Sequence, residues 1–536
     1  MSKQTEGWST RIGVILAVAG SAVGLGNFLR FPGVAAQNGG GAFMIPYFCA
    51  LLLVGIPIAW AEWTMGRYGG QRGLHSAPSI LGLFGGRPAR YLGIVGILVP
   101  LSVSFYYTFI EAWCLGYFWQ FVTGGMGIDP TTSIDTQTAV ASGFYNDFTG
   151  TGSNGLLFGG GYETFLFWGI TFALNIYFIF RGLSRGIELF CRFALPLMAV
   201  MALIVLIRVL TLGTPDPTYP DQNVINGLGY MWNPNFDALL NAETWLAAAG
   251  QIFFSISVGF GIILNYSSYL SRKDDVVLSS LSSTATNEVF EVSFGGLITV
   301  TASFIFLGLS GTIAAVSTGT FGLGFVTLPV VFAHMGAFGN VIGAIWFFML
   351  FLAAVTSSLS MYQPAVAFFQ ESLGVTRNRA TTIMVSICLV GSFMTIWFSK
   401  GSVFWSTIDN WVGTFLIFVL AMIQIICFSW IFGVRKGIDS AHEGAEMRIP
   451  RIYWFIMKWV TPIYLIVVFI AFAWSSLGGW IRDVTEQTEA QLAFGLIVAV
   501  TVLLLICLRI GEKRWYAEGR DIDGKHDLEI EEGERA

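Results

Sequence analysis

Two glycine-rich interruptions break long apolar segments of this 536-residue chain. The first is Val23-Gly24-Leu25-Gly26, and the second is Val258-Gly259-Phe260-Gly261 in the other half of the chain. A glycine inside a helix costs about 1 kcal/mol relative to alanine, so each interruption predicts locally unwound backbone. Unwound backbone inside a membrane is tolerated only where protein or a water-filled cavity surrounds it. Breaks at corresponding places in two halves are typical of the central binding site of a secondary transporter.

Polar side chains close to the two breaks supply the chemistry that such a site needs. Asn27 and Arg30 follow the first break, and Ser255 and Ser257 precede the second. The N-terminus of a half-helix offers free N–H groups and partial positive charge to a carboxylate. Carbonyl and side-chain oxygens suit a small, hard alkali cation. One break alone is explained equally well by packing, whereas the matching pair favours a binding site.

Other polar residues lie deep in apolar segments, and each alone also has a structural explanation. A buried Asn such as Asn287 usually bonds a neighbouring helix, and the run Thr356-Ser357-Ser358 could bond the preceding turn or join helices. Tyr106 and Tyr107 could be interface anchors. Four carboxylates are embedded or nearly so, and we expect most to be structural: Glu62, Glu111, Glu288 and Glu291.

The elements that position these residues are membrane helices. Hydrophobic residues make up 54% of the chain and charged residues 11%, whereas soluble domains carry about 25% charged residues. We therefore predict an all-α polytopic membrane protein with a single membrane domain. Apolar stretches of about 18 or more residues predict about twelve transmembrane helices, at 11–36, 41–70, 88–124, 162–182, 187–212, 240–270, 276–308, 337–370, 378–398, 403–432, 450–475 and 488–511.

Basic residues are distributed unequally between the two sets of loops. The long loops 125–161 and 213–239 contain no Lys or Arg, whereas the alternate loops contain many. The positive-inside rule then predicts a multi-pass protein of the cell (inner or plasma) membrane with both termini cytoplasmic. Residues 512–536 are densely charged, which predicts a poorly ordered cytoplasmic tail.

Several functions are disfavoured. The six cysteines lie in or beside apolar segments and suggest no disulfide framework, and the four histidines are scattered without metal-ligand spacing. Phosphate-binding loops and supported nucleophile–base pairs are not recognised, so we expect no enzyme. Nothing suggests a nucleic-acid partner. The expected partners are a small-molecule substrate and the lipid bilayer, with the oligomeric state, monomer or dimer, left open.

Longer motifs resemble the neurotransmitter:sodium symporter family, in its prokaryotic branch of amino-acid transporters. The motifs are the runs 8–13, 20–32, 38–47, 250–261 and 356–358, and the similarity extends over about residues 8–510. The resemblance implies a five-plus-five inverted repeat with broken first and sixth helices. The implied order is a cytoplasmic N-terminus (1–10), repeats at 11–213 and 214–432, two peripheral helices (433–511) and the charged tail (512–536).

The resemblance also implies a substrate and two sodium ions at the broken helices. The first sodium site would use Ala22, Asn27, Ser255 and Asn287 with the substrate carboxylate. The second would use Gly20, Val23, Ala353, Thr356 and Ser357. The substrate would contact Leu25, Gly26, Val103, Tyr107, Phe254, Ser257, Phe260, Ser358 and Met361. Monoamine members place an Asp where this chain has Gly24, so we expect an amino acid that brings its own carboxylate.

Gates and ion dependence follow from the same resemblance. The outer gate would be Arg30 with Asp409, closed over by Tyr107 and Phe254. Thr5 and Glu371 occupy the positions of the family's inner Arg–Asp gate, which leaves that pairing open. Glu291 stands where chloride-dependent members have Ser, so its negative charge would replace the halide. This carboxyl could also return protonated after sodium release, giving some proton antiport.

The resulting hypothesis is a sodium-coupled, chloride-independent symporter of neutral, hydrophobic L-amino acids that works by alternating access. Two alternatives remain open. The same fold could carry another carboxylated substrate, such as a betaine or a γ-amino acid, or the protein could be a transceptor that senses its substrate without coupled transport.

Overall fold

A computed structural model describes residues 7–159 and 161–524 of the chain. Within these ranges the regular structure is helical, with one isolated β-bridge between Gly40 and Pro234. The helices are α1 (Arg11–Ala22), α2 (Phe31–Gln37), α3 (Met44–Ala50), α4 (Ile56–Gly70), α5 (Ala77–Leu92), α6 (Val95–Val122), α7 (Ile134–Thr149), α8 (Tyr162–Phe180), α9 (Leu189–Leu210), α10 (Val224–Trp232), α11 (Ala242–Ile256), α12 (Ile262–Ser267), α13 (Val276–Glu288), α14 (Gly296–Ser317), α15 (Gly319–Gly322), α16 (Leu328–Ala333), α17 (Gly339–Leu373), α18 (Arg377–Trp397), α19 (Val403–Ile408), α20 (Ile417–Ile426), α21 (Val434–Ala441), α22 (Ile452–Phe455), α23 (Thr461–Glu486) and α24 (Thr488–Ala517). Short π-helical segments continue several of them, including η1 (Gly26–Arg30), η7 (Val289–Gly295), η11 (Asp409–Leu416), η12 (Cys427–Ile431) and η13 (Ile456–Val460).

The expected membrane segments are present. In the described ranges ten helical segments are long and apolar enough to cross a membrane, and α1 with the segment 26–37 forms an eleventh that bends by 48°. The remaining expected span, 240–270, consists of two helices, α11 with 15 residues and α12 with 6. Each is too short to cross alone, because the second glycine-rich break lies between them.

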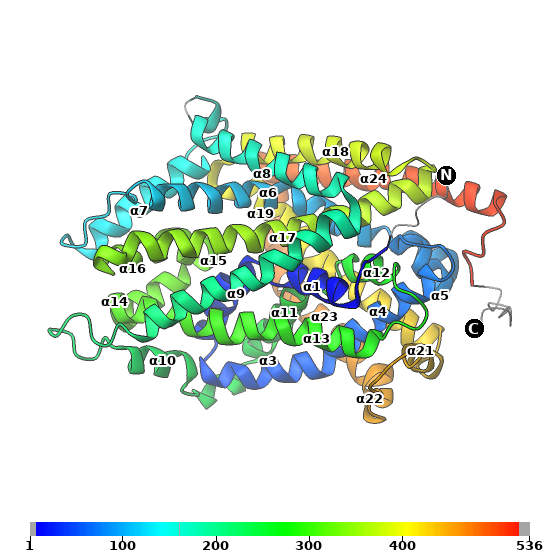
Figure 1. Ribbon diagram of the computed structural model, residues 1–536, viewed down its shortest axis with the longest axis horizontal. Helices are drawn as coiled ribbons and strands as arrows, with labels where there is room; N and C mark the ends of the chain where they lie inside the picture. The colour runs from blue at the N-terminus through cyan, green and yellow to red at the C-terminus, as the bar shows by residue number, and fades with distance from the viewer. Residues whose placement is uncertain (1–6, 160, 525–536) are drawn as a thin grey trace.

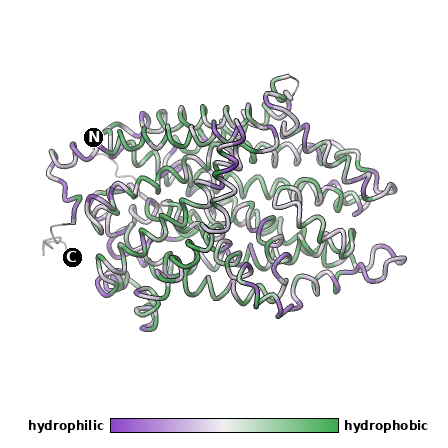
Figure 2. Tube along the Cα trace, turned by 180° about the vertical axis from the view of Figure 1, so that it is seen from behind, coloured by the Kyte–Doolittle hydropathy of each residue, from purple (hydrophilic) through white to green (hydrophobic). Residues whose placement is uncertain are grey.

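The helices lie roughly along the long axis of the molecule (Figure 1). The beginning and the end of the described chain lie at one end of this axis with α5, α21 and α22, while α7 and α10 from the long Lys- and Arg-free loops lie at the other. Hydrophilic residues gather toward both ends, and the segments between them are largely hydrophobic (Figure 2). The described chain therefore begins and ends on the same side of the apolar belt.

Helix α17 is the central element. It has 35 residues and packs against α1, α6, α9 and α18. Its middle carries the run Thr356-Ser357-Ser358, whose side chains are fully or almost fully buried. The first broken segment packs against this helix through α1 and against the second through contacts of α1 with α11 and α12. The core thus gathers the polar residues that the sequence singles out.

Three parts of the chain are more ordered than expected. Helix α5 begins in the interval between the expected spans 41–70 and 88–124, and α15 and α16 fold within the connection after α14. The first part of the charged stretch 512–536 is ordered, since α24 continues to Ala517 and Trp515 and Ile522 are buried. Buried aromatic and aliphatic side chains explain why this polar stretch is packed on the protein.

Candidate functional site

The first break is an extended step between α1 and η1. Val23 has φ −71° and ψ 94°, which ends α1, and the amide of Gly24 donates to Oδ1 of Asn27 over 2.9 Å. A Cβ at Gly24 would lie 3.1 Å from both the Ser357 Oγ and the Tyr107 hydroxyl. Gly24 therefore leaves space in which these two hydroxyls approach the unwound backbone.

The second break has a different backbone. Ser257, Gly259 and Gly261 have φ values of 56°, 75° and 78°, all in the left-handed region. Such a conformation is costly for a serine and favours glycine. The amide of Gly259 donates to Oε1 of Glu62 over 3.1 Å, so a buried carboxyl from α4 supports the unwound chain.

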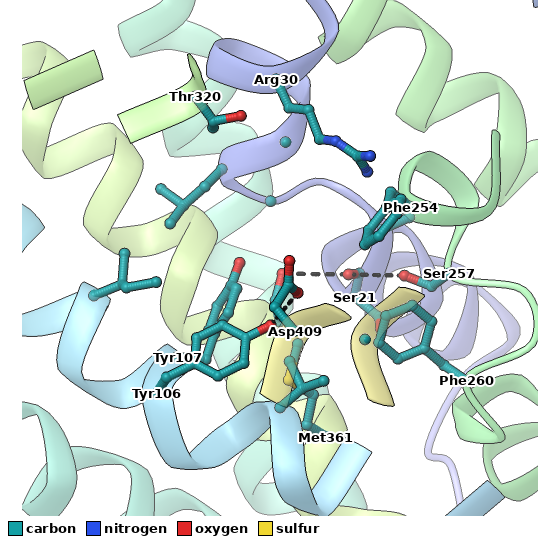
Figure 3. A pocket seen from close by; sticks show the side chains of 18 of the residues that line it. Ser21, Arg30, Tyr106, Tyr107, Phe254, Ser257, Phe260, Thr320, Met361 and Asp409 are labelled. Atoms are coloured by element: carbon teal, nitrogen blue, oxygen red, sulfur yellow. Dashed lines mark hydrogen bonds between the residues drawn. The ribbon is translucent and has the colours of Figure 1, made fainter. Parts of the chain in front are cut away.

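The two breaks face a cavity of about 210 Å³ (Figure 3). Eight of the nine expected substrate contacts line it: Leu25, Gly26, Val103, Tyr107, Phe254, Ser257, Phe260 and Met361. The sequence reasoning did not name Ile110, Ile262, Thr320, Phe321 and Trp405, which also line it. Thr320 and Phe321 belong to α15, in the connection between α14 and α16, which no pattern in the sequence marked as part of the site.

Ser358 is the exception. Its Oγ donates to Oδ1 of Asn175 over 2.7 Å, and Nδ2 of Asn175 donates to Oε2 of Glu111 over 2.7 Å. Ser357 and Met361, four residues apart, share the cavity face of α17, whereas Ser358 is turned by about 100° from Ser357. Ser358 therefore joins α17 to α6 and α8 away from the cavity.

The residues expected at the first sodium site meet at the cavity wall, to which Ala22 and Asn27 belong. Asn27 Nδ2 lies 2.8 Å from Asn287 Oδ1, and Asn287 Nδ2 lies 2.6 Å from Ser255 Oγ. With its amide turned over, Asn287 instead accepts from the Ser255 hydroxyl, and its nitrogen lies 3.3 Å from the Ala22 carbonyl. All four residues are thus adjacent, and they offer carbonyl, amide and hydroxyl oxygens, the donors that an alkali cation prefers.

Three of the residues expected at the second sodium site, Ala353, Thr356 and Ser357, bring oxygen atoms together on α17. Thr356 Oγ1 and Ser357 Oγ donate to the Ala353 carbonyl over 2.9 and 3.1 Å. The hydroxyl lone pairs remain available, because Thr356 donates its one proton to the Ala353 carbonyl and Ser357 shares its one proton between the Ala353 and Ser21 carbonyls. A Cβ at Gly20 would lie 3.4 Å from the Thr356 Cβ, so α1 approaches α17 closely here. The donor set fits a hard cation.

Glu291 adjoins the first of these clusters. Its carboxylate accepts from Gln251 Nε2 over 2.8 Å, from Asn27 Nδ2 over 3.1 Å and from the Ser255 hydroxyl. It is fully buried. Gln251 was not singled out from the sequence, although its place four residues before Ser255 was a usable signal. A buried carboxyl group therefore sits directly beside the expected ion ligands.

One carbonyl links both breaks to α17. The Ser21 carbonyl oxygen accepts from the Ser257 and Ser357 hydroxyls, each over 3.2 Å (Figure 3). A change in either broken segment would therefore disturb the other.

The outer-gate residues are both in the cavity wall, but each has another neighbour. The Arg30 guanidinium lies 3.6 Å from the centre of the Phe254 ring. Asp409 accepts from the Tyr106 hydroxyl over 2.6 Å. Among the described ion pairs none joins Arg30 to Asp409, so the expected pair is not formed in this conformation.

At the end opposite the outer gate, several contacts join the N-terminal segment to neighbouring parts of the chain. Trp8 Nε1 donates to the Tyr266 carbonyl over 2.9 Å, and Arg11 pairs with Asp275 over 3.3 Å. Thr5 lies outside the described residues. Glu371 accepts from the Ser76 amide and the Ser79 hydroxyl over 2.9 and 3.0 Å, so it holds the start of α5 against α17.

Comparison with known proteins places these features in a family. A family model described as the sodium:neurotransmitter symporter family matches residues 5–133 and 130–515. An uncharacterized sodium-dependent transporter of Methanocaldococcus jannaschii is 30% identical over 470 residues, covering 87% of this chain and 90% of the relative. A sodium-dependent nutrient amino acid transporter 1 of Drosophila grimshawi is 28% identical over 506 residues, covering 86% and 76%.

The fold is shared with a solved structure, MhsT in complex with L-phenylalanine. The two align with a TM-score of 0.72 and 24% identity, over 87% of this chain and 99% of MhsT. This likeness confirms the expected all-helical polytopic membrane fold. The matched proteins are transporters and not enzymes.

Proposed function

Because the chain belongs to the sodium:neurotransmitter symporter family, we propose that it couples sodium entry to uptake of neutral, hydrophobic L-amino acids. The observation that carries this proposal is the cavity, whose wall joins both helix breaks to buried oxygen clusters. The relatives support the substrate class: the fly relative is named as an amino acid transporter, and the MhsT complex contains L-phenylalanine.

The shape and chemistry of the cavity favour an α-amino acid with an apolar side chain. A Cβ at Gly26 would have no atom within 4 Å, so the backbone there is open to a carboxylate. Val103, Phe260 and Met361 offer apolar surface farther along the wall. A betaine or a longer γ-amino acid is the alternative substrate. Its carboxylate would make the same contacts as the carboxylate of an α-amino acid.

Two sodium ions would be bound and carried, one at each oxygen cluster. The first would also contact the substrate carboxylate, which makes substrate binding depend on sodium. Each ion entering an inside-negative cell contributes about 2.3 kcal/mol per 100 mV. Two ions therefore suffice to accumulate substrate. A transceptor would instead bind sodium and substrate without accumulating the substrate.

Transport would proceed by alternating access between two closures. Arg30 would leave the Phe254 ring and pair with Asp409 to close the outer side. Release of the Trp8 and Arg11 contacts would open the inner side. The proposed orientation, with both termini in the cytoplasm, follows from the Lys- and Arg-free long loops at the opposite end.

Glu291 would make transport independent of chloride, because its negative charge beside the first sodium cluster would take the place of a bound chloride ion. Its protonation after sodium release would give proton antiport. Replacing Glu291 by Ser removes the charge and should make uptake newly chloride-dependent. Uptake by this variant that ignores both chloride and pH would contradict the role.

The direct test of the proposal is equilibrium binding of labelled L-phenylalanine to purified protein in sodium or in choline. Unlabelled leucine, tryptophan, alanine, glycine, betaine and γ-aminobutyrate would compete. We expect sodium-dependent binding displaced best by the large apolar α-amino acids. Preferential displacement by betaine or γ-aminobutyrate would move the substrate to the alternative class.

A further inference from the structure

A groove lies between the end of the second repeat and the first peripheral helix. It has a volume of about 680 Å³ and is walled by η12 and the start of α21 on one side and by α22 and η13 on the other. This groove is at the same end of the molecule as the chain termini, where α21 and α22 lie together (Figure 1). It is remote from the helix breaks and shares no lining residue with the central cavity.

Two cations line the groove without an acidic partner. The Arg435 guanidinium lies 5.5 Å from the Trp454 ring centre, and the Lys458 ammonium lies 5.4 Å from the Trp459 ring centre. Both side chains are exposed, and no described ion pair involves either of them. Asp439, the acid of α21, forms no described ion pair with Arg435. The groove therefore presents uncompensated positive charge framed by indole rings.

Two further polar features face the same space. Ser429 is only 2% exposed and lines the groove, yet its Oγ has no hydrogen-bond partner among the described residues. Helix α21 begins at the groove wall after Gly433, and no side chain caps its first amides. A buried orphan hydroxyl and a free helix N-terminus both offer donors to an anion.

An apolar stripe leads away from this polar end. Phe455, Trp459, Ile463 and Val467 recur every four residues along α22, η13 and α23, and they are 58%, 45%, 51% and 60% exposed. Residues at this spacing lie on one helix face. Trp430 adds a third indole to the groove and donates to the Lys458 carbonyl over 2.6 Å. Trp beside exposed apolar surface marks the height of the lipid head groups.

We propose that this groove binds an anionic glycerophospholipid of the adjacent leaflet. The phosphate lies at the start of α21 between Arg435 and Lys458, where the Ser429 hydroxyl donates to it. The acyl chains run along the stripe from Phe455 to Val467. Unpaired cations at a headgroup-level groove suit an anionic lipid, and the contiguous apolar stripe suits its tails rather than a free phosphate. The assignment to the cytoplasmic leaflet rests on the proposed orientation.

The test is lipid binding to full-length, delipidated protein in detergent, followed by native mass spectrometry and by thermal unfolding. Phosphatidylglycerol and phosphatidylcholine with identical acyl chains are compared. We expect phosphatidylglycerol to bind more tightly and to raise Tm more. In the double variant Arg435→Gln, Lys458→Gln this preference should fall roughly tenfold or more, because both phosphate-facing cations are lost.

The matched control is the double variant Arg448→Gln, Arg451→Gln, which removes the same charge from exposed positions nearby that do not line the groove. It should keep the preference. The single variant Ser429→Ala should weaken phosphatidylglycerol binding with little change of fold, and it serves if the double variant is not monodisperse. Equal binding of both lipids, or an unchanged preference in the Arg435 and Lys458 variant, would overturn the site. Equal stabilisation by inorganic phosphate or glycerol 3-phosphate would replace it with a soluble-anion site.

Discussion

The two helix breaks use glycine for different physical reasons. At the first break, Gly24 and Gly26 are absent from the left-handed residues of the chain, and they matter for the room that they leave. At the second, Gly259 and Gly261 have positive φ, and a Cβ at Gly259 would also lie 2.8 Å from the Ile417 carbonyl oxygen. Similar motifs therefore build a binding surface in one half and a backbone turn in the other.

This difference predicts how a substitution at each break affects the protein. A side chain added at the first break should leave the fold intact and change what binds. A side chain added at the second should strain the backbone before any ligand is considered. Glycine-to-alanine substitutions separate the two cases, because they add one methyl group and no charge.

The largest effect is expected for Gly261→Ala. The left-handed backbone alone costs about 1–3 kcal/mol, and the added Cβ would collide with the Gly96 carbonyl oxygen. We expect little monodisperse protein and the largest fall of Tm. Gly250→Ala is the control in the same segment, since its Cβ would have no atom within 4 Å. It should raise Tm slightly, and equal Tm values for the two variants would refute the backbone role.

Gly26→Ala should have the next largest effect, on binding rather than on folding. Its methyl group has open space but projects where we place the substrate carboxylate. We expect near-normal Tm and at least a tenfold loss of L-phenylalanine affinity, or about 1.4 kcal/mol. Gly33→Ala, whose Cβ would make an ordinary contact of 3.7 Å with Leu323, is the control. Wild-type affinity in Gly26→Ala would show that the substrate carboxylate does not bind at this break.

Gly24→Ala should have a smaller effect on sodium. The methyl group would lie 3.1 Å from the Ser357 and Tyr107 hydroxyls, which must shift by a few tenths of an ångström. Mild overpacking of about 1 kcal/mol corresponds to roughly fivefold weaker sodium activation of substrate binding. Sodium titration of binding measures it. An unchanged sodium dependence would mean that Ser357 is not an ion ligand.

The smallest effect tests how the inner half-helix α12 is docked. His75 stacks on Tyr269 with ring centres 4.4 Å apart, and its carbonyl accepts from Asn265 over 2.7 Å. Burial, with a contribution from Arg520, lowers the pKa of His75 from 6.5 to about 4. The neutral ring therefore contributes stability that is present above pH 6.5 and is lost as the pH falls toward 4.

His75→Gln removes this titration. Between pH 7 and pH 5 the wild-type Tm should fall by about 1–2 °C more than that of the variant. Differential scanning fluorimetry at matched ionic strength measures both curves. Parallel curves would show that His75 does not report the docking of α12.

Much of the architecture was predictable because a membrane helix requires a long apolar segment, which is visible in the sequence. The breaks were visible as glycines, and the ion-ligand candidates as polar residues that hydrocarbon does not tolerate alone. Ser358 shows the limit of this reasoning. Its type and position in the run match its neighbours, and only the rotation of α17 turns it toward Asn175.

Other features depend on contacts between distant segments. The left-handed backbone of Ser257 follows from the packing of α11 and α12 and not from its residue type. The burial of Trp515 depends on the Glu371 carbonyl, to which its indole donates over 2.9 Å. The lipid groove requires η12 and η13 to lie together, which no local pattern specifies. Sequence therefore identified which residues were unusual, while tertiary packing determined their partners.

The central claim is that sodium entry drives accumulation of a hydrophobic amino acid through the cavity between the two breaks. The most direct measurement is uptake of radiolabelled L-phenylalanine and leucine into proteoliposomes, with an inward sodium gradient or with choline at fixed chloride. The account predicts accumulation above the equilibrium level in sodium, abolished by Asn27→Ala and by Thr356→Ala. Sodium-tightened binding without accumulation would contradict coupled transport and assign the protein to substrate sensing.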